Sequence, residues 1–197
     1  VLVLSSDGVW LRAPAAAESD TTDPVKIATN PAYGPVLGGA YTDEYVLVVQ
    51  KTAMSKLALN EGGAPELTSW MIYADVQVMS VAQAYGWAIV ADQFNVALFY
   101  GDQTRLGITG TTLAVKYATV NADHNRIYVA GTNGDAEVIE VWQYNNMTDR
   151  FDDLVATLAS PVTGITQMIA DVGIPDDLEL VVVGQDGIAG YTAIESD

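Results

Sequence analysis

Residues 126–144 read RIYVAGTNGDAEVIEVWQY. Two runs rich in Val, Ile and Tyr flank Asn133-Gly134, a pair that tolerates the positive φ angles of a tight turn between paired strands. The apolar residues of the two runs are nearly continuous, which indicates strands that are covered on both faces. This stretch therefore predicts a β-hairpin whose strands lie in the middle of a small sheet.

Four other segments repeat this pattern of an apolar run, a turn and a second apolar run. They are Val1–Ala13, Tyr45–Asn60, Trp87–Gly101 and Leu178–Ile194. The centres of the five hairpins lie near Val3, Val48, Val90, Val129 and Val182. Their spacing of roughly 40 to 50 residues is that of propeller blades with about four strands each.

The segments between the hairpins each contain two weaker apolar runs separated by Gly, Pro, Asn or Asp, which adds two strands to each unit. These runs are PVKIAT (24–29) and PVLGGAY (35–41), LTSWMIYAD (67–75) and VQVMSVAQAY (76–85), RLGITG (105–110) and TLAVKYATV (112–120), and DLVATLAS (153–160) and VTGITQMIAD (162–171). A helical bundle is excluded because β-branched residues and Tyr dominate these runs, and Gly or Pro interrupts almost every longer window.

We therefore expect an all-β fold, a β-propeller of about five four-stranded blades that forms a single domain over residues 1–197. A β-sandwich would use the same turns, and an incomplete portion of a larger propeller is the other alternative. The propeller interpretation predicts that five residues occupy equivalent inner positions of successive sheets. They are Val3, Leu47, Val90, Val129 and Val182.

The strand count leaves the two terminal units incomplete. With each hairpin as the two middle strands of a blade, the first unit lacks its inner strand and the last lacks its outer strand. Unpaired strand edges invite strand addition. We expect a partner chain, or more of the same polypeptide, to pair with the strand containing Val1–Ser6 or with that containing Gly190–Ile194.

Two stretches resemble the blades of the WD40-like propeller superfamily. PVTGITQMIADVGIPDDLELVVVGQDGIAGYTA (161–193) and VNADHNRIYVAGTNGDAEVIEVWQY (120–144) both pass from an apolar strand through an acidic turn to an inner strand and a Gly-containing turn. The Gly-His pair and the strand-ending Trp-Asp of that superfamily are absent, and Val141-Trp142-Gln143 is the nearest approach to the latter. The resemblance implies a propeller that serves as an interaction platform.

Composition excludes several classes of function. The chain has 25 acidic and 8 basic residues and a net charge of -17, so it lacks the basic surface that nucleic-acid binding requires. It has no Cys and one His, which excludes Cys-ligated metals, thiol nucleophiles and multi-histidine metal sites within one chain. Its longest apolar runs, such as Leu178–Val183, are too short to cross a bilayer.

Few residues suggest catalysis. His124 follows Asp123 just before an apolar strand. A catalytic His needs a nucleophile or carboxylate beside it, and in a regular strand Asp123 would face away from His124. We therefore interpret His124 as a turn residue. The carboxylate pairs Asp152-Asp153 and Asp176-Asp177 are expected between strands, where Asp satisfies turn backbone. Glu137 and Glu140 flank the fourth hairpin without an evident catalytic neighbour. We therefore predict that the protein is not an enzyme and needs no cofactor.

Calcium is the metal that an acidic chain is best equipped to bind, because its ligands are oxygen atoms. Four candidate ligands fall within one short segment. They are Asp171, Asp176, Asp177 and Glu179. Ile174 and Pro175 interrupt their spacing, so a solvated acidic turn is the competing interpretation.

Aromatic residues and one glycosylation triplet complete the candidates. Trp10, Trp87 and Trp142 fall inside apolar runs and are expected in the core, whereas Trp70 lies in a weaker run. Asn146-Met147-Thr148 matches the N-glycosylation pattern in an expected surface turn.

These patterns favour a non-catalytic scaffold or a subunit of a larger assembly. Its partner would be a protein or other copies of the same chain. Two alternatives remain. One is a carbohydrate-binding or glycoside-acting propeller that uses acidic and aromatic residues. The other is a structural subunit of a surface layer, fibre or capsid.

Salt should stabilise the fold, because repulsion within a chain of net charge -17 opposes compaction. We expect the melting temperature to rise between about 0.01 M and 1 M NaCl, a range over which the screening length falls from about 30 Å to about 3 Å. A flat or falling curve would show that repulsion contributes little to stability.

Overall fold

The computed structural model describes residues 2–6, 8–11, 25–42, 45–58, 65–72, 77–100, 103–106, 108, 110–170, 178–192 and 194. Within them, strands that follow one another along the chain form five antiparallel sheets. The sheets are β1 (Leu2–Ser5), β2 (Gly8–Leu11) and β3 (Val25–Ile27); β4 (Val36–Tyr41), β5 (Val46–Gln50), β6 (Ala53–Ala58) and β7 (Glu66–Ile72); β8 (Val78–Ala84), β9 (Trp87–Asp92), β10 (Val96–Tyr100) and β11 (Gln103–Leu106); β12 (Ala114–Asn121), β13 (Arg126–Asn133), β14 (Ala136–Asn145) and β15 (Arg150–Ala159); and β16 (Gln167–Ile169), β17 (Leu180–Val183) and β18 (Ile188–Tyr191). A 3-10 helix, η1 (Pro31–Tyr33), precedes β4.

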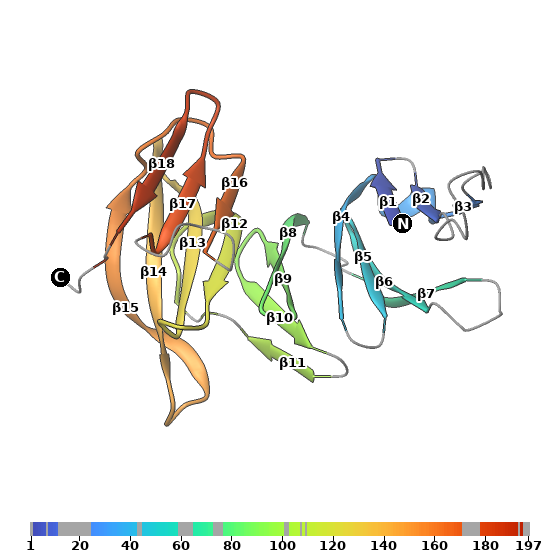
Figure 1. Cartoon of the computed structure of the whole chain (residues 1–197), viewed down its shortest axis with the longest axis horizontal. Coiled ribbons are helices and arrows are strands. Elements are labelled where there is room, and N and C mark those ends of the chain that lie inside the picture. The colour runs from blue at the N-terminus through green and yellow to red at the C-terminus, as the bar shows by residue number, and fades with distance from the viewer. Residues whose placement is uncertain are drawn as a thin grey trace, which may run out of the picture.

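The five sheets succeed one another in chain order, and the two ends of the chain lie at opposite ends of the row (Figure 1). The first strand of each sheet lies beside the first strand of the next, since β4 contacts β8, β8 contacts β12 and β12 contacts β16. In the first sheet, β1 is the strand that contacts β4. The arrangement is an open row of stacked sheets, and the all-β prediction is confirmed.

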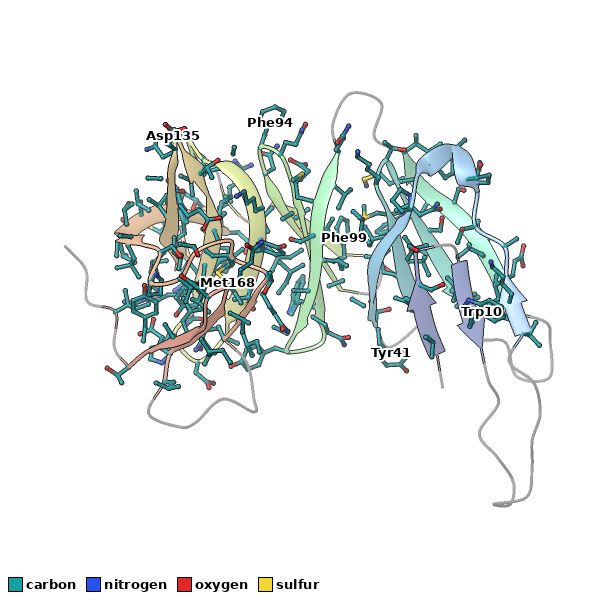
Figure 2. The ribbon with its side chains drawn as sticks, turned by 90° about the horizontal axis from the view of Figure 1, so that it is seen from above. Trp10, Tyr41, Phe94, Phe99, Asp135 and Met168 are labelled. Carbon is teal, nitrogen blue, oxygen red and sulfur yellow. The ribbon has the colours of Figure 1, made fainter. Side chains whose placement is uncertain are left out.

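Each gap between neighbouring sheets holds one hydrophobic cluster. Leu57 of the second sheet packs with Val9 of the first, and Phe99 of the third packs with Leu47 of the second. Figure 2 shows Phe99 in that second gap and Met168 inside the last one. Trp142 fills the gap between the third and fourth sheets. The core is therefore a series of layers, each shared by two sheets.

The middle strands serve two layers at once, which is why their sequences are almost wholly apolar. On β13, Ile127 and Val129 face the third sheet, while Tyr128 and Ala130 face the fifth. Successive side chains of a strand point to opposite faces, so a strand covered on both sides needs apolar residues at every position. The expectation that both faces of these strands are covered is confirmed for the second, third and fourth sheets. In the first sheet it is wrong, because Val3 on β1 is 53% exposed.

The five residues predicted to be equivalent lie on five different sheets, but one is out of register. Val90, Val129 and Val182 pair with Val81, Ala118 and Met168 at matching positions of the preceding strands. The matching pair in the second sheet is Val48 with Gly39. Leu47 is therefore the wrong residue by one position, and it faces the opposite neighbour because a one-residue slip exchanges the two faces of a strand.

A repeated backbone hydrogen bond joins the first four sheets. The amide of Val36 donates to the carbonyl of Ser6 at 3.2 Å, that of Val78 to Lys51 at 2.8 Å, and that of Val115 to Gln93 at 3.2 Å. Each acceptor immediately follows β1, β5 or β9, and each donor is a buried Val at the start of the next sheet. This equivalence identifies β1 as a counterpart of the second strands.

A β-bulge follows each of these three valines. The register between first and second strands shifts between Val36 and Gly38, between Val78 and Ser80, and between Val115 and Tyr117. A bulge inserts one unpaired residue and redirects the strand. The inserted residues are Leu37, Met79 and Lys116, and their side chains are partly exposed.

The terminal sheets have three strands each among the described residues. Because β1 corresponds to β5, the first sheet holds second, third and fourth strands, and its inner position is open. The last sheet holds first, second and third strands, with β18 at its outer edge. This matches the strand count that the sequence predicts for the two terminal units.

One local expectation is wrong. Asp152 and Asp153 were expected between strands, but both lie within β15. They are exposed there or nearly so, on an edge strand whose partner β14 covers one side only. Thr148 donates a hydrogen bond to the Asp152 carboxylate at 2.6 Å, so this side chain still supports the neighbouring turn.

Val78→Ala should destabilise the fold by about 2 kcal/mol, because it removes two buried methyl groups from the layer between the second and third sheets. Val25→Ala is the matched control, since Val25 is exposed on β3 and should change stability by less than about 0.5 kcal/mol. Chemical denaturation measures both. Equal effects of the two substitutions would contradict the layered core.

Candidate functional site

The inner side of the row carries a concave feature built by several sheets. A cavity of about 610 Å³ is lined by β4, β8 and β12 and by the segment around β16. These are the first strands of four consecutive sheets, whose free edges meet there. The bulge residues Leu37 and Met79 both line it, and each is 40% exposed.

The lining residues of this cavity are uncharged, in contrast to the acidic chain as a whole. Ser80, Thr119 and Gln167 contribute polar groups among the apolar ones. The Gln83 amide is held by the backbone of Tyr41, accepting from its N–H at 3.0 Å and donating to its carbonyl at 2.9 Å. The surface is thus suited to a neutral partner group of mixed polarity.

A buried carboxylate organises the contact between the fourth and fifth sheets. Glu179, which is 2% exposed, lies just before β17 and forms an ion pair with Arg126 Nη1 at 2.7 Å. Tyr128 donates its hydroxyl to the same carboxylate, and the Ile194 amide donates to Oε2 at 2.9 Å. Arg126 also donates to the Ile194 carbonyl at 2.6 Å. The cluster binds β13, β17 and the segment after β18 together.

The charge state of this cluster follows from its partners. Burial opposes the charged form of Glu179, but hydrogen bonds from Tyr128 and Ile194 and the Arg126 guanidinium outweigh it and lower the pKa of the carboxyl. Burial and the neighbouring carboxylate raise the pKa of the Tyr128 hydroxyl. At neutral pH the site is a glutamate–arginine ion pair with a protonated tyrosine.

Glu137 forms a second polar contact between the fourth and fifth sheets. Its carboxylate accepts from Lys116 Nζ at 3.0 Å and from the Gly164 amide at 2.7 Å, and these contacts lower its pKa. Glu140 lies deeper in β14, where it accepts from Thr111 Oγ1 at 2.7 Å and from the Trp142 indole at 3.0 Å. Both glutamates, which the sequence left without a role, bind structural partners.

The one candidate calcium ligand among the described residues, Glu179, gives the calcium hypothesis no support. Asp171, Asp176 and Asp177 lie outside the described residues. Glu179 is described, and its two oxygens already accept hydrogen bonds from Arg126, Tyr128 and Ile194. Among the described residues, no group of three or more His, Asp or Glu side chains is arranged to hold a metal ion.

The other catalytic candidates that the structure describes occupy turns or strands. His124 is exposed in the β12–β13 turn, and its amide donates to Asn121 Oδ1 at 3.1 Å, which agrees with the interpretation as a turn residue. Asp152 and Asp153 lie on β15, and Asp176 and Asp177 fall outside the described residues. Asn146 of the glycosylation triplet lies in the exposed β14–β15 turn.

The tryptophans divide differently from the prediction. Trp142 is buried as expected, but Trp10 and Trp87 are only partly buried. Trp70 packs edge-to-face on two rings, with its ring centre 5.2 Å from that of Phe99 and 6.2 Å from that of Tyr45. The Nζ atom of Lys56 lies 4.1 Å from the Trp70 ring centre. The expected core role of Trp10 is therefore wrong, whereas Trp87 packs against the hydrophobic cluster between the third and fourth sheets and is buried in part.

The sequence did not point to the inner cavity or to Arg126. The cavity residues come from four weaker apolar runs, and three of these runs share a bulge that follows a buried Val. Arg126 was noticed only as the first residue of an apolar strand. Its pairing with Glu179 joins positions 53 residues apart, which local sequence patterns do not reveal.

The sequence matches no protein-family model, and a search of curated proteins finds no match. No helix among the described residues has the length and apolar character needed to cross a membrane.

Glu179→Gln should destabilise the fold by about 3 kcal/mol at pH 7, because it leaves Arg126 without its buried counter-charge. Since the folded-state pKa of Glu179 is lowered, its contribution is complete above the ordinary value of 4.5 and is lost as the pH falls below it. The difference in the free energy of unfolding between the Glu179→Gln variant and the wild type should therefore become smaller from pH 5 to pH 3.

Glu66→Gln, on the exposed edge strand β7, is the matched control and should stay within about 0.5 kcal/mol of the wild type. Denaturant unfolding across this pH range measures all three proteins. A Glu179→Gln protein as stable as the control at pH 7 would show that the ion pair does not stabilise the contact.

Proposed function

We propose that the protein is an open segment of a β-propeller and acts as a non-catalytic binding platform within a larger assembly. Consecutive four-stranded meanders that stack through their first strands around an inner cavity support the propeller assignment. The resemblance to WD40-like blades points to the same architecture and to interaction as its role.

One observation carries the assembly proposal. Val3 stands at the position that Val48, Val90, Val129 and Val182 occupy in the other sheets. Those four are 0%, 1%, 0% and 0% exposed because each packs on the preceding sheet, whereas Val3 is 53% exposed. A position that the repeat buries elsewhere is here an apolar surface, which favours an additional protein layer on this face.

The open face of the first sheet has features suited to such a layer. Val3, Trp10 and Lys26 lie opposite one another across β1, β2 and β3. The Lys26 ammonium lies 5.2 Å from the Trp10 ring centre, and the Trp10 indole donates to Ser5 Oγ at 3.3 Å. At the other end of the row, Ile188 on β18 is 73% exposed.

The occupant that fits best is another β-sheet layer, supplied by a partner protein or by another copy. A sheet face with Trp10 on its central strand and Val3 beside it matches the apolar, aromatic centre of protein interfaces. A structural subunit of a layer, fibre or capsid would use the same faces repeatedly. A carbohydrate-binding role would instead require glycans to bind to the monomer, which a glycan array tests.

Val3→Lys should dissociate the native assembly, because it places a charge in the apolar part of this face. Met147→Lys is the matched control, since Met147 is 94% exposed in the β14–β15 turn, far along the chain from the first sheet. Light scattering after size exclusion should give a native mass above 20.9 kDa, the mass of one chain.

Val3→Lys should lower that mass, and Met147→Lys should leave it unchanged. Thermal melts of the isolated chains establish that both variants fold. A native protein of single-chain mass without a bound partner would contradict the assembly proposal, and so would an assembly that Val3→Lys leaves intact.

A further inference from the structure

A second, smaller cavity lies at the end of the contact between the third and fourth sheets. Its volume is about 220 Å³, and apolar surface predominates in its lining. Leu98 and Val120, both buried, form its interior. Three turns border it, the β8–β9, β12–β13 and β14–β15 turns, so it is built where hairpin ends of two sheets converge.

Four aromatic side chains line this pocket. Tyr85 and Trp87 come from the third sheet, and Tyr144 and Phe151 from the fourth. All four are partly exposed. The rings of Tyr144 and Phe151 pack edge-to-face, with their centres 5.3 Å apart. Tyr85, Trp87 and Phe151 pack on the hydrophobic cluster between the two sheets with part of their surface and line the pocket with the rest. A mostly apolar pocket lined by aromatic rings is a surface suited to a ligand.

The backbone around the pocket is strained. Among the described residues, three that are not glycine have positive φ angles: Tyr85 at 50°, Asn125 at 51° and Asp149 at 55°. All three line this pocket. Asn and Asp tolerate this region, but a bulky side chain such as Tyr85 is unfavourable there. Strain of this kind concentrates at ligand sites, where the surrounding structure maintains it.

Tyr85 makes the point most clearly. Tyr85-Gly86 is a two-residue turn in which both φ angles are positive, and Asn-Gly is the preferred sequence for such a turn. A tyrosine at the first position costs stability. That cost is understandable if the aromatic ring serves the pocket.

The polar groups of the pocket are largely engaged already. Asn121 accepts from the His124 amide at 3.1 Å and donates to the Glu179 carbonyl at 3.4 Å. Asp149 accepts the hydroxyl proton of Tyr144. The pocket can therefore offer few new hydrogen bonds to a ligand, which disfavours sugars and primary ammonium groups, both of which need several.

The charge of the lining sets the sign of the ligand. Asp149 is its one charged residue within the described part of the chain, and the protein as a whole carries -17. Anions are repelled and cations attracted. A cation without hydrogen-bond donors, bound against aromatic faces beside a carboxylate, is a quaternary ammonium group.

We propose that this pocket binds a trimethylammonium group through Tyr85, Trp87, Tyr144 and Phe151, with Asp149 supplying the opposite charge. The group can belong to a small molecule of the choline type or to a trimethylated lysine side chain on a protein. The chemistry of recognition is the same for both.

The test is titration of the purified chain with tetramethylammonium chloride, monitored by tryptophan fluorescence and calorimetry, with sodium chloride at equal ionic strength as the reference. We expect saturable binding with a Kd of about 1 mM or tighter. Two neutral compounds should bind at least about tenfold more weakly. 3,3-Dimethylbutan-1-ol, the neutral isostere of choline, lacks the positive charge. Methyl glucoside would find few hydrogen-bond partners in the pocket.

Choline and a trimethyllysine peptide, compared with the unmodified peptide, distinguish the two sources of the group. Tighter binding of choline assigns a small molecule, and tighter binding of the methylated peptide assigns a protein ligand. A response equal to that of sodium chloride overturns the proposal. Equal binding of the neutral isostere or of the sugar also overturns it.

Two variants connect the binding to the pocket. Asp149→Asn keeps a side chain that tolerates the turn conformation and should weaken binding about fivefold, whereas Asp123→Asn, in the exposed β12–β13 turn, should not change it. Tyr85→Asn keeps a residue that favours the turn conformation but removes an aromatic ring from the pocket, and it should weaken binding by about fivefold or more. Unchanged affinity in both pocket variants contradicts the proposal.

Discussion

The fold depends on one repeated backbone hydrogen bond. A buried Val amide at the start of one sheet donates it to the carbonyl that immediately follows β1, β5 or β9 of the sheet before. Val36, Val78 and Val115 make this bond. It fixes how far each sheet is displaced from the next, so the side chains of the second strands interleave in the intervening layer. The bulge that follows each Val then turns the first strand toward the inner cavity.

The last pair of sheets is joined differently. There Glu179 binds Arg126, Tyr128 and Ile194, and Glu137 binds Lys116 and Gly164. Buried ion pairs stabilise little on balance, because desolvation opposes the Coulomb attraction, but they penalise any arrangement that separates the partners. The charged contacts thus specify how the last sheet docks, while the apolar layers supply most of the stability.

Sequence patterns predicted the hairpins, their spacing and the burial of the middle strands on both faces, because periodicity and turn residues are local properties. They missed the one-residue offset between Leu47 and Val48, because two adjacent apolar residues look alike when both faces are covered. The pocket at Trp87 was missed for a similar reason. A tryptophan in an apolar run looks like core until the turns around Tyr85, Asn125 and Asp149 are brought beside it.

Native-state hydrogen exchange at the three Val amides tests this account most directly. Each of these amides donates its hydrogen bond to the preceding sheet and not to its own. We therefore predict that Val36, Val78 and Val115 exchange only through openings whose free energy is close to that of global unfolding. The exposed amide of Phe94, held in the β9–β10 turn by the Asp92 side chain, provides a fast-exchanging reference. Exchange of the three Val amides at the rate of Phe94 would contradict the claim that these bonds set the stacking of the sheets.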